Sequence, residues 1–210
     1  MLDAAALLAF VPAVLAVVVA PGPDTVYAVT AGLRAGRPGG LAAALGTATG
    51  VLVHTVAAVL GLSALLRTSA LAYDLVQYVG AAYLIYVGGR MLLRDGEFAV
   101  DDAGGGDRSL GRTYRDAVGI NVSNPKVAVF VLAFLPQFVP AGAEATVHLS
   151  VFGALYALLS FAYLAVVGVF AGRARSLLVE SPRVRRGVQY ASGSVLVAFG
   201  VALALDDRPA

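Results

Sequence analysis

The chain has 210 residues, of which 59% are hydrophobic and 13% charged, and its formal net charge is +2. A soluble domain is typically about 25% charged, so this composition indicates a protein embedded in a lipid bilayer. The absence of cysteine excludes structural disulfides, thiol catalysis and cysteine-ligated metal sites. The small net charge gives no support for binding to nucleic acid.

Six apolar segments follow one another along the chain, and a transmembrane helix needs about 20 apolar residues. We therefore predict an all-α membrane protein with six transmembrane helices in a single domain over residues 1–210. The beginning of the chain lacks the basic region of a secretory signal, so the first segment is expected to remain in the membrane. The predicted segments are residues 4–33, 41–64, 71–92, 116–139, 146–171 and 188–205.

The first and fourth segments are each interrupted by proline next to a charged residue, in the sequence PGPD at residues 21–24 and NPK at residues 124–126. Proline removes a backbone donor and clashes with the preceding turn, so we predict that helices 1 and 4 are broken there. A broken helix persists in lipid only where its freed backbone faces protein or a wet cavity. Corresponding breaks in the two halves of a membrane protein point to a transport site.

Both motifs also have the pattern of a helix start. Gly22 can cap a helix whose first residue is Pro23, and Asn124 is a favourable cap for a helix beginning at Pro125. The first N–H groups of both helices would then face the break. Such a helix terminus can hold a carboxylate.

Four side chains near the breaks are candidate site residues: Asp24, Asn121, Lys126 and His54. A charge at the centre of a transmembrane helix costs about 2.5–3.5 kcal/mol, and such charges are usually functional. Lys126 opposes the dipole of its helix, so we expect an anion beside it, either Asp24 or a substrate carboxylate. Asp24 and His54 are the candidates for carrying a coupling proton.

Each of these residues also has a plainer interpretation. Asp24 and Lys126 can lie near the membrane interface, where they would only cap a helix or extend to water. His54 can donate one hydrogen bond to a neighbouring helix. Asn121 is expected to divide its role between the site and the repair of the broken backbone.

A polar, glycine-rich stretch divides the chain into two halves. Residues 94–115 predict a flexible loop, which separates a first three-helix repeat (1–93) from a second (116–210). Because three crossings reverse the direction of the chain, the second repeat runs opposite to the first. This is the condition for an inverted repeat, with a site near the midplane.

Arginines are distributed unevenly between the predicted loops. Twelve fall in the loops around residues 34–37, 90–115 and 173–186, whereas only Arg67 and Arg208 fall on the other side. Basic residues are retained on the cytoplasmic side, so the sequence predicts a multi-pass protein of the cell membrane with both termini outside the cytoplasm.

The sequence gives little support for other classes of protein. It contains no H-E-x-x-H, G-x-S-x-G or Walker A motif, so we expect neither an enzyme nor a bound cofactor. A metal-cation transporter is the alternative, but divalent cations usually require more than one carboxylate and only Asp24 is plainly inside a segment. The glycine pair Gly46 and Gly50 allows close helix packing within one subunit or between the subunits of a homo-oligomer.

The motifs together resemble the LysE/RhtB family of amino-acid exporters over nearly the full length of the chain. Either broken-helix motif alone would be weak, but their combination at this spacing is specific. The matching pieces are PGPD at residues 21–24, residues 46–54, residues 80–88, residues 119–126, residues 134–138, Gly193 and Gly200.

This resemblance implies a transporter that exports amino acids or close derivatives from the cytoplasm in exchange for protons. Its members differ in cargo, so the substrate does not follow from membership. Carried over to the matching positions, the resemblance implies that substrate is bound at the two breaks, by Gly22, Pro23, Asp24, Asn121, Asn124, Pro125 and Lys126.

Overall fold

A computed structural model describes residues 4–68, 70–93, 109–139, 144–178 and 181–205. All regular structure in these ranges is helical. The helices are α1 (Ala4–Val19), α2 (Pro23–Thr68), α3 (Ala70–Leu93), α4 (Leu110–Val122), α5 (Pro125–Val129), α6 (Ala145–Val169), α7 (Ala171–Leu178) and α8 (Pro182–Ala204), with a π-helical turn η1 (Phe130–Phe134) and a 3₁₀ turn η2 (Leu135–Phe138) after α5.

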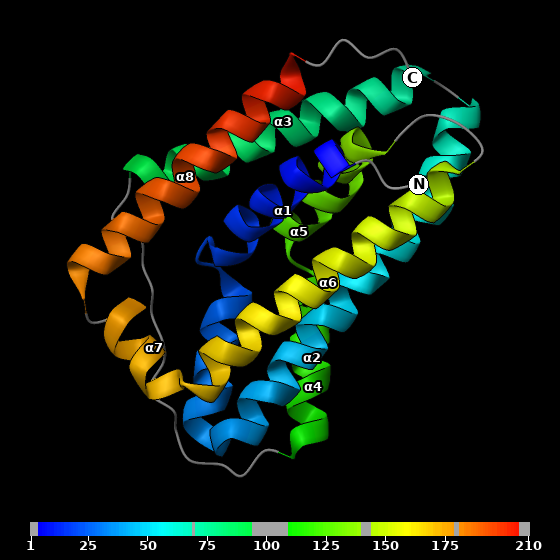
Figure 1. The fold of residues 1–210 in the computed structure, drawn as a ribbon. Coiled ribbons are helices and arrows are strands. Elements are labelled where there is room, and N and C mark those ends of the chain that lie inside the picture. Colours follow the sequence, from blue (N-terminus) through cyan, green and yellow to red (C-terminus); the bar gives the residue numbers. More distant parts are fainter. Residues whose placement is uncertain (1–3, 69, 94–108, 140–143, 179–180, 206–210) are drawn as a thin grey trace.

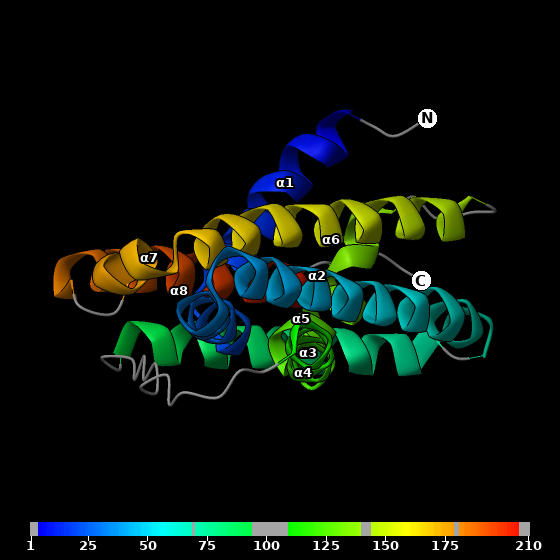
Figure 2. The same cartoon turned by 90° about the horizontal axis from the view of Figure 1, so that it is seen from below.

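Two groups of helices run side by side (Figure 1). In the first group α2 packs along α6 and α4, and in the second α3 packs along α8. α1 and α5 lie between the groups in Figure 1. Figure 2 shows that α1 leaves the rest of the bundle at an angle; Phe10, Ala13, Val14 and Val17 of this helix are nevertheless fully buried.

The connection between the first two predicted segments is a sharp bend inside α2. Ala35 and Gly36 have non-helical backbone angles, and Gly36 has φ 61°, which favours glycine because it has no Cβ. Helical structure continues on both sides of the bend, where the sequence predicted the end of one segment at residue 33 and the start of the next at residue 41.

Glycines bring α2 into direct backbone contact with its neighbours. A Cβ at Gly46 would collide with the carbonyl of Tyr114 on α4, and one at Gly40 would collide with the backbone of Gly168 on α6. The second group is joined in the same way, because a Cβ at Gly88 on α3 would lie 2.6 Å from the carbonyl oxygen of Gly193 on α8. These close approaches are typical of helix packing in membranes.

The second proline motif separates α4 from α5. The segments Leu110–Val122 and Pro125–Phe138 are bent by 56° relative to each other. α4 begins at Leu110 and is capped by Ser109, whose side chain accepts a hydrogen bond from the Arg112 N–H. Residues 110–115 are therefore helical, although the sequence assigned them to the loop; residues 94–108 of that loop lie outside the described residues.

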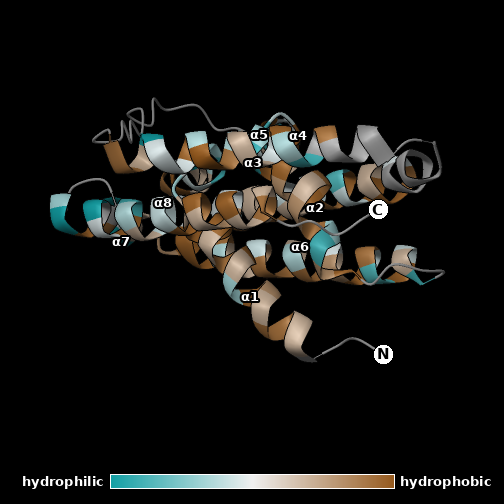
Figure 3. Cartoon of the chain, turned by 90° about the horizontal axis from the view of Figure 1, so that it is seen from above, coloured by the Kyte–Doolittle hydropathy of each residue, from teal (hydrophilic) through white to brown (hydrophobic). Residues whose placement is uncertain are grey.

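The surface of the described part is strongly apolar. Leu8, Leu60, Leu75 and Leu158 are each more than 60% exposed, and Figure 3 shows hydrophobic residues spread over most helices, with hydrophilic ones gathered on α7. Such a surface is unstable in water and suits contact with lipid. Three described helices are long and apolar enough to span a membrane (Pro23–Gly61, Ala145–Val169 and Pro182–Ala204), or four if the bent pair counts as one.

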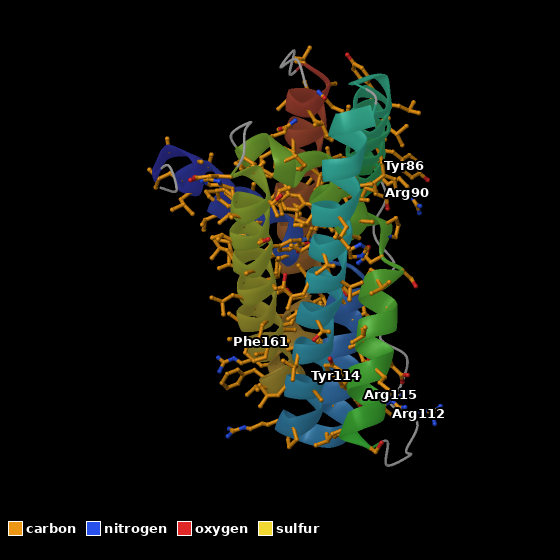
Figure 4. All side chains as sticks on the ribbon, turned by 90° about the vertical axis from the view of Figure 1, so that its right-hand side faces the viewer. Tyr86, Arg90, Arg112, Tyr114, Arg115 and Phe161 are labelled. Atoms are coloured by element: carbon orange, nitrogen blue, oxygen red, sulfur yellow. The ribbon has the colours of Figure 1, made fainter. Side chains whose placement is uncertain are left out.

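Arginines cluster where α2 bends, α4 begins and α6 is followed by α7. Arg112 and Arg115 project at the lower end of Figure 4, at the start of α4. Arg34 and Arg37 flank the bend of α2, and Arg173 and Arg175 belong to α7. We call this part of the molecule the arginine-rich end.

Candidate functional site

The two broken segments meet, and the Asp24 carboxylate joins them. Asn121 at the end of α4 donates from Nδ2 to Asp24 Oδ1 at 3.1 Å. Asn124, between α4 and α5, donates from Nδ2 to Asp24 Oδ2 at 2.6 Å. Asp24 is 9% exposed, and hydrogen bonds to a buried charge are stronger than those between neutral groups.

Asn124 also forms the predicted cap of α5. Its Oδ1 accepts a hydrogen bond from the Lys126 N–H at 3.1 Å, while its backbone carbonyl accepts from the N–H groups of Val127 and Ala128. The cap is therefore confirmed, and it has a consequence that the sequence did not predict. Because Asn124 occupies the first N–H groups of α5, this helix terminus has little left to offer a carboxylate.

Lys126 reaches back from α5 to the end of α1. Its Nζ donates to the carbonyl oxygens of Val17 at 2.9 Å and Ala20 at 2.8 Å. The ammonium thus bonds to the C-terminus of a helix, whose free carbonyls carry partial negative charge. Asp24, the anion expected beside Lys126, lines the same cavity without bonding to it directly. An ammonium has three N–H donors, so one remains after these two bonds.

Gly22 gives Lys126 the space for this contact. A Cβ at Gly22 would lie 3.2 Å from Lys126 Nζ, closer than ordinary van der Waals contact. Pro23 and Pro125 are the first residues of α2 and α5, where a missing N–H is tolerated. These three residues shape the breaks and are absent from the lining of the cavity described below.

His54 on α2 lies against the second break. Its Nε2 is 3.2 Å from the backbone oxygen of Asn121, and since that oxygen can only accept, Nε2 carries the hydrogen. The Asn124 N–H donates to the same oxygen at 2.9 Å. His54 therefore supports the end of α4, and its Nδ1 is the ring atom that can take up a proton.

A cavity of about 20 Å³ lies between the breaks and α6, which is room for about one water molecule. The sequence predicted three of its lining residues. The full lining is Asp24, Thr25 and Thr47 of α2, Asn121 of α4, Lys126 and Val127 of α5, Val17 and Val18 of α1, and Tyr156, Ser160 and Leu164 of α6. Asn121 Oδ1 is buried there without a hydrogen-bond partner among the described residues.

The α6 side of this cavity was missed by sequence reasoning. The segment has no proline and no charge to mark it, and it reads as an ordinary apolar span. The available signal was the spacing of Tyr156, Ser160 and Leu164, which recur every four residues and so share one face of the helix.

Aromatic side chains close the cavity on the side away from the arginine-rich end. Tyr156 packs against Phe130 with ring centroids 5.1 Å apart. Phe10 of α1 packs against Phe152 at 4.7 Å and Phe138 at 5.1 Å. α1 therefore contributes both to the cavity wall and to the closure above it.

The described residues contain no group of three or more His, Asp or Glu side chains that could hold a metal ion. At the breaks Asp24 contributes one carboxylate, and both of its oxygens already accept hydrogen bonds from asparagine amides. Divalent cations prefer several oxygen ligands, so the chemistry of the site does not favour the cation alternative.

An apolar helical bundle with buried charges at paired breaks defines a membrane protein of the transporter class. The chain belongs to the LysE type translocator family, whose family model matches residues 15–207.

The chain is similar over most of its length to several bacterial membrane proteins. It is 29% identical over 203 residues to the uncharacterized membrane protein YrhP of Bacillus subtilis, covering 93% of this chain and 96% of the relative. It is 32% identical over 189 residues to an uncharacterized membrane protein of Vibrio cholerae, covering 88% and 89%. It is 27% identical over 184 residues to the homoserine/homoserine lactone efflux protein of Salmonella typhimurium, covering 88% of each. No solved structure matches the chain.

Proposed function

We propose that this protein is a secondary transporter that exports amino acids or close derivatives across the cell membrane by proton antiport. The observation that carries the proposal is the meeting of the two breaks, which places Asp24, Asn121 and Lys126 around one buried cavity. Membership of the LysE type translocators and similarity to a homoserine/homoserine lactone efflux protein support the same conclusion.

The cavity offers groups of both signs for a zwitterion. The third N–H of Lys126 and the backbone N–H groups of Asp24 and Thr25, which have no acceptor among the described residues, suit a carboxylate. The unpartnered Oδ1 of Asn121 suits an ammonium group, with Asp24 supplying the negative charge. Gly22, Pro23, Asn124 and Pro125 hold the backbone in the shape that brings these groups together.

Transport requires the cavity to enlarge. Ligand pockets typically have about 300–1,000 Å³, far more than the space present here, so this conformation has no room for an amino acid. Toward the arginine-rich end, α2 and α4 are joined by the Tyr27 hydroxyl. It donates to the Thr113 carbonyl at 3.3 Å and to Asp116 Oδ2 at 3.4 Å, and these contacts form the second closure. On the other side the packed aromatic rings of Phe10, Phe138 and Phe152, which we call the aromatic closure, must move apart. Alternating access consists of opening these two closures in turn.

Lys126 connects the occupied site to the aromatic closure. A substrate carboxylate competes with the carbonyls of Val17 and Ala20 for the same ammonium group. When Lys126 turns to the substrate, α1 loses its polar attachment and Phe10 can withdraw from Phe152. The substrate thereby promotes opening on the side through which it leaves.

Six spans in two inverted three-helix repeats account for this arrangement. In the first repeat, α1 and the first part of α2 form span 1, the rest of α2 forms span 2, and α3 forms span 3. In the second repeat, α4 through η2 form span 4, α6 forms span 5, and α8 forms span 6. The arginine-rich end then faces the cytoplasm and both termini face outward. Protons are carried by Asp24 or His54, which contact the asparagines of the second break.

A counterflow screen of amino acids in proteoliposomes at two pH values tests the function. We expect uptake of a labelled amino acid against an internal pool of the same compound, with net export that depends on the pH gradient. If the purified wild-type protein exchanges none of the amino acids or their lactones at either pH, the proposed function is wrong.

A further inference from the structure

Four helical hydroxyl groups in this protein bond to their own helix. Thr30, Thr49, Thr55 and Ser150 each donate to the carbonyl four residues earlier, at 2.8, 3.0, 2.9 and 2.8 Å. This is the ordinary way in which a serine or threonine in a helix satisfies its hydroxyl without water.

Two hydroxyl groups at the cavity differ from this pattern. Thr47 of α2 and Ser160 of α6 are only 4% and 3% exposed, and both line the cavity. Neither has a hydrogen-bond partner within the described parts of the chain. Both residues line the cavity with a hydroxyl to which no described group bonds, so each hydroxyl can bond to a polar group that enters.

α6 packs closely on α2 on both sides of Ser160. On one side of Ser160 a Cβ at Gly153 would collide with the side chain of Thr55, and on the other side Gly168 is in backbone contact with Gly40. These two contacts with α2 fix the stretch between them, and a fixed element can discriminate between ligands more sharply than a mobile one.

The zwitterion groups are supplied from the opposite wall, by Lys126, Asn121 and the start of α2. A bound amino acid oriented by them directs its side chain away from these groups, toward the part of the lining that contains Ser160 of α6 and Thr47 in the later part of α2. We propose that Ser160 and Thr47 are specificity-determining residues, which select amino acids whose short side chain carries a hydrogen-bonding group over apolar side chains of the same shape. This inference rests on the proposed function.

Threonine and valine provide the test, because they have nearly the same shape and differ by one hydroxyl. Counterflow of labelled threonine is measured with unlabelled threonine or valine as competitor, in wild type, Ser160→Ala and Thr47→Val. One neutral hydrogen bond corresponds to a factor of about five, so we expect each substitution to reduce the preference for threonine by about fivefold. Ser160→Thr, which retains a hydroxyl, should preserve it.

Two matched controls address effects on folding. Ser150→Ala lies on the same helix as Ser160, and Thr30→Val lies on the same helix as Thr47; both remove hydroxyls that bond to their own backbone. They should leave the preference unchanged. An unchanged preference in both Ser160→Ala and Thr47→Val, with wild type active, overturns the inference and leaves the exporter intact. A wild type that exchanges no amino acid overturns the proposed function, and this inference with it.

Discussion

Asp24 and Asn124 are 100 residues apart in the chain, yet their side chains share a hydrogen bond of 2.6 Å. Asn121, 97 residues from Asp24, bonds to the other carboxylate oxygen. The start of α2 and the start of α5 are therefore held by one charge. Because both asparagines bond to that charge, a change at Asp24 affects both breaks at once.

Asp24→Asn tests this arrangement directly. The substitution retains the shape of the side chain but replaces one accepting oxygen with an N–H₂ group, which opposes the amide donor of either Asn121 or Asn124 and leaves the other without a charged acceptor. Hydrogen bonds to a charged group are worth about 1.5–3 kcal/mol each, so we expect export to fall by about tenfold or more. Export of labelled amino acid from cells is measured together with the amount of protein in the membrane, which should stay nearly normal.

The control for Asp24→Asn is Glu144→Gln, which removes the same charge from an exposed residue just before α6. It should export at the wild-type rate. Unchanged export in Asp24→Asn would remove this carboxylate from the mechanism, whatever its contacts.

Gly50→Ala should disturb the site without altering any polar group. A Cβ at Gly50 would lie 2.5 Å from Asn121 Oδ1 and 2.7 Å from Asn121 Cβ, so Asn121 must move away from α2. Overpacking of this kind costs about 1–3 kcal/mol. We expect a lower thermal unfolding temperature in detergent and reduced export.

Gly61 is the control for this substitution, because it lies on the same helix with no atom within 4 Å of a Cβ placed there. Gly61→Ala should unfold at the wild-type temperature. Equal unfolding temperatures for Gly50→Ala and wild type would show that Asn121 can move away from an added methyl group without loss of stability, contrary to this prediction.

The elements that depend on local chemistry could be predicted from the sequence. Proline and asparagine have strong positional preferences at helix starts, so the cap at Asn124 and the start of α2 at Pro23 followed from the residues themselves. The pairing of the two motifs across the bundle followed from the expectation that buried charges seek polar partners.

Features that depend on three-dimensional packing could not be predicted. Lys126 bonds to the carbonyls of Val17 and Ala20, and nothing in an apolar helix end indicates which side chain will approach it. Ser160 lies in an uninterrupted apolar run, where a single hydroxyl usually bonds to its own helix. Its position at the cavity becomes evident only when α6 is placed against the breaks.

His54→Gln separates proton coupling from substrate binding. Glutamine can still donate an N–H to the Asn121 carbonyl, but it has no ring nitrogen that could accept a proton. If His54 carries the coupling proton, counterflow should remain while stimulation of net export by a pH gradient is lost. Proteoliposomes with and without a pH gradient measure both properties in one preparation.

Two other results for His54→Gln are informative. Retained stimulation by the pH gradient would exclude His54 and leave Asp24 as the candidate. Loss of counterflow as well would show that His54 acts mainly by supporting the end of α4.

The proposed orientation can be tested by labelling single cysteines, because the natural chain has none. Gly111→Cys places a thiol at the exposed start of α4, at the arginine-rich end, and Glu144→Cys places one before α6. In intact cells a membrane-impermeant maleimide should label position 144 and should label position 111 only after permeabilisation. The reverse pattern would place the arginine-rich end outside the cytoplasm.

Lys126→Met tests whether Lys126 restrains α1. The substitution keeps a long apolar side chain but removes the donors to Val17 and Ala20. Combined with Ala13→Cys, which places a small thiol at a fully buried position of α1, it reports on movement of that helix. Losing the charged hydrogen bonds should raise the rate of maleimide labelling at position 13 by about tenfold or more, without any substrate present.

Lys126→Arg retains donors for the same carbonyls, so position 13 should be labelled nearly as slowly as in the protein with Lys126. Ala43→Cys, at a fully buried position of α2, controls for general loosening and should not respond to Lys126→Met. Equal labelling at position 13 with lysine and methionine at position 126 would mean that α1 is held by its apolar contacts alone. In that case substrate cannot release α1 through Lys126, and the aromatic closure must be opened by another part of the bundle.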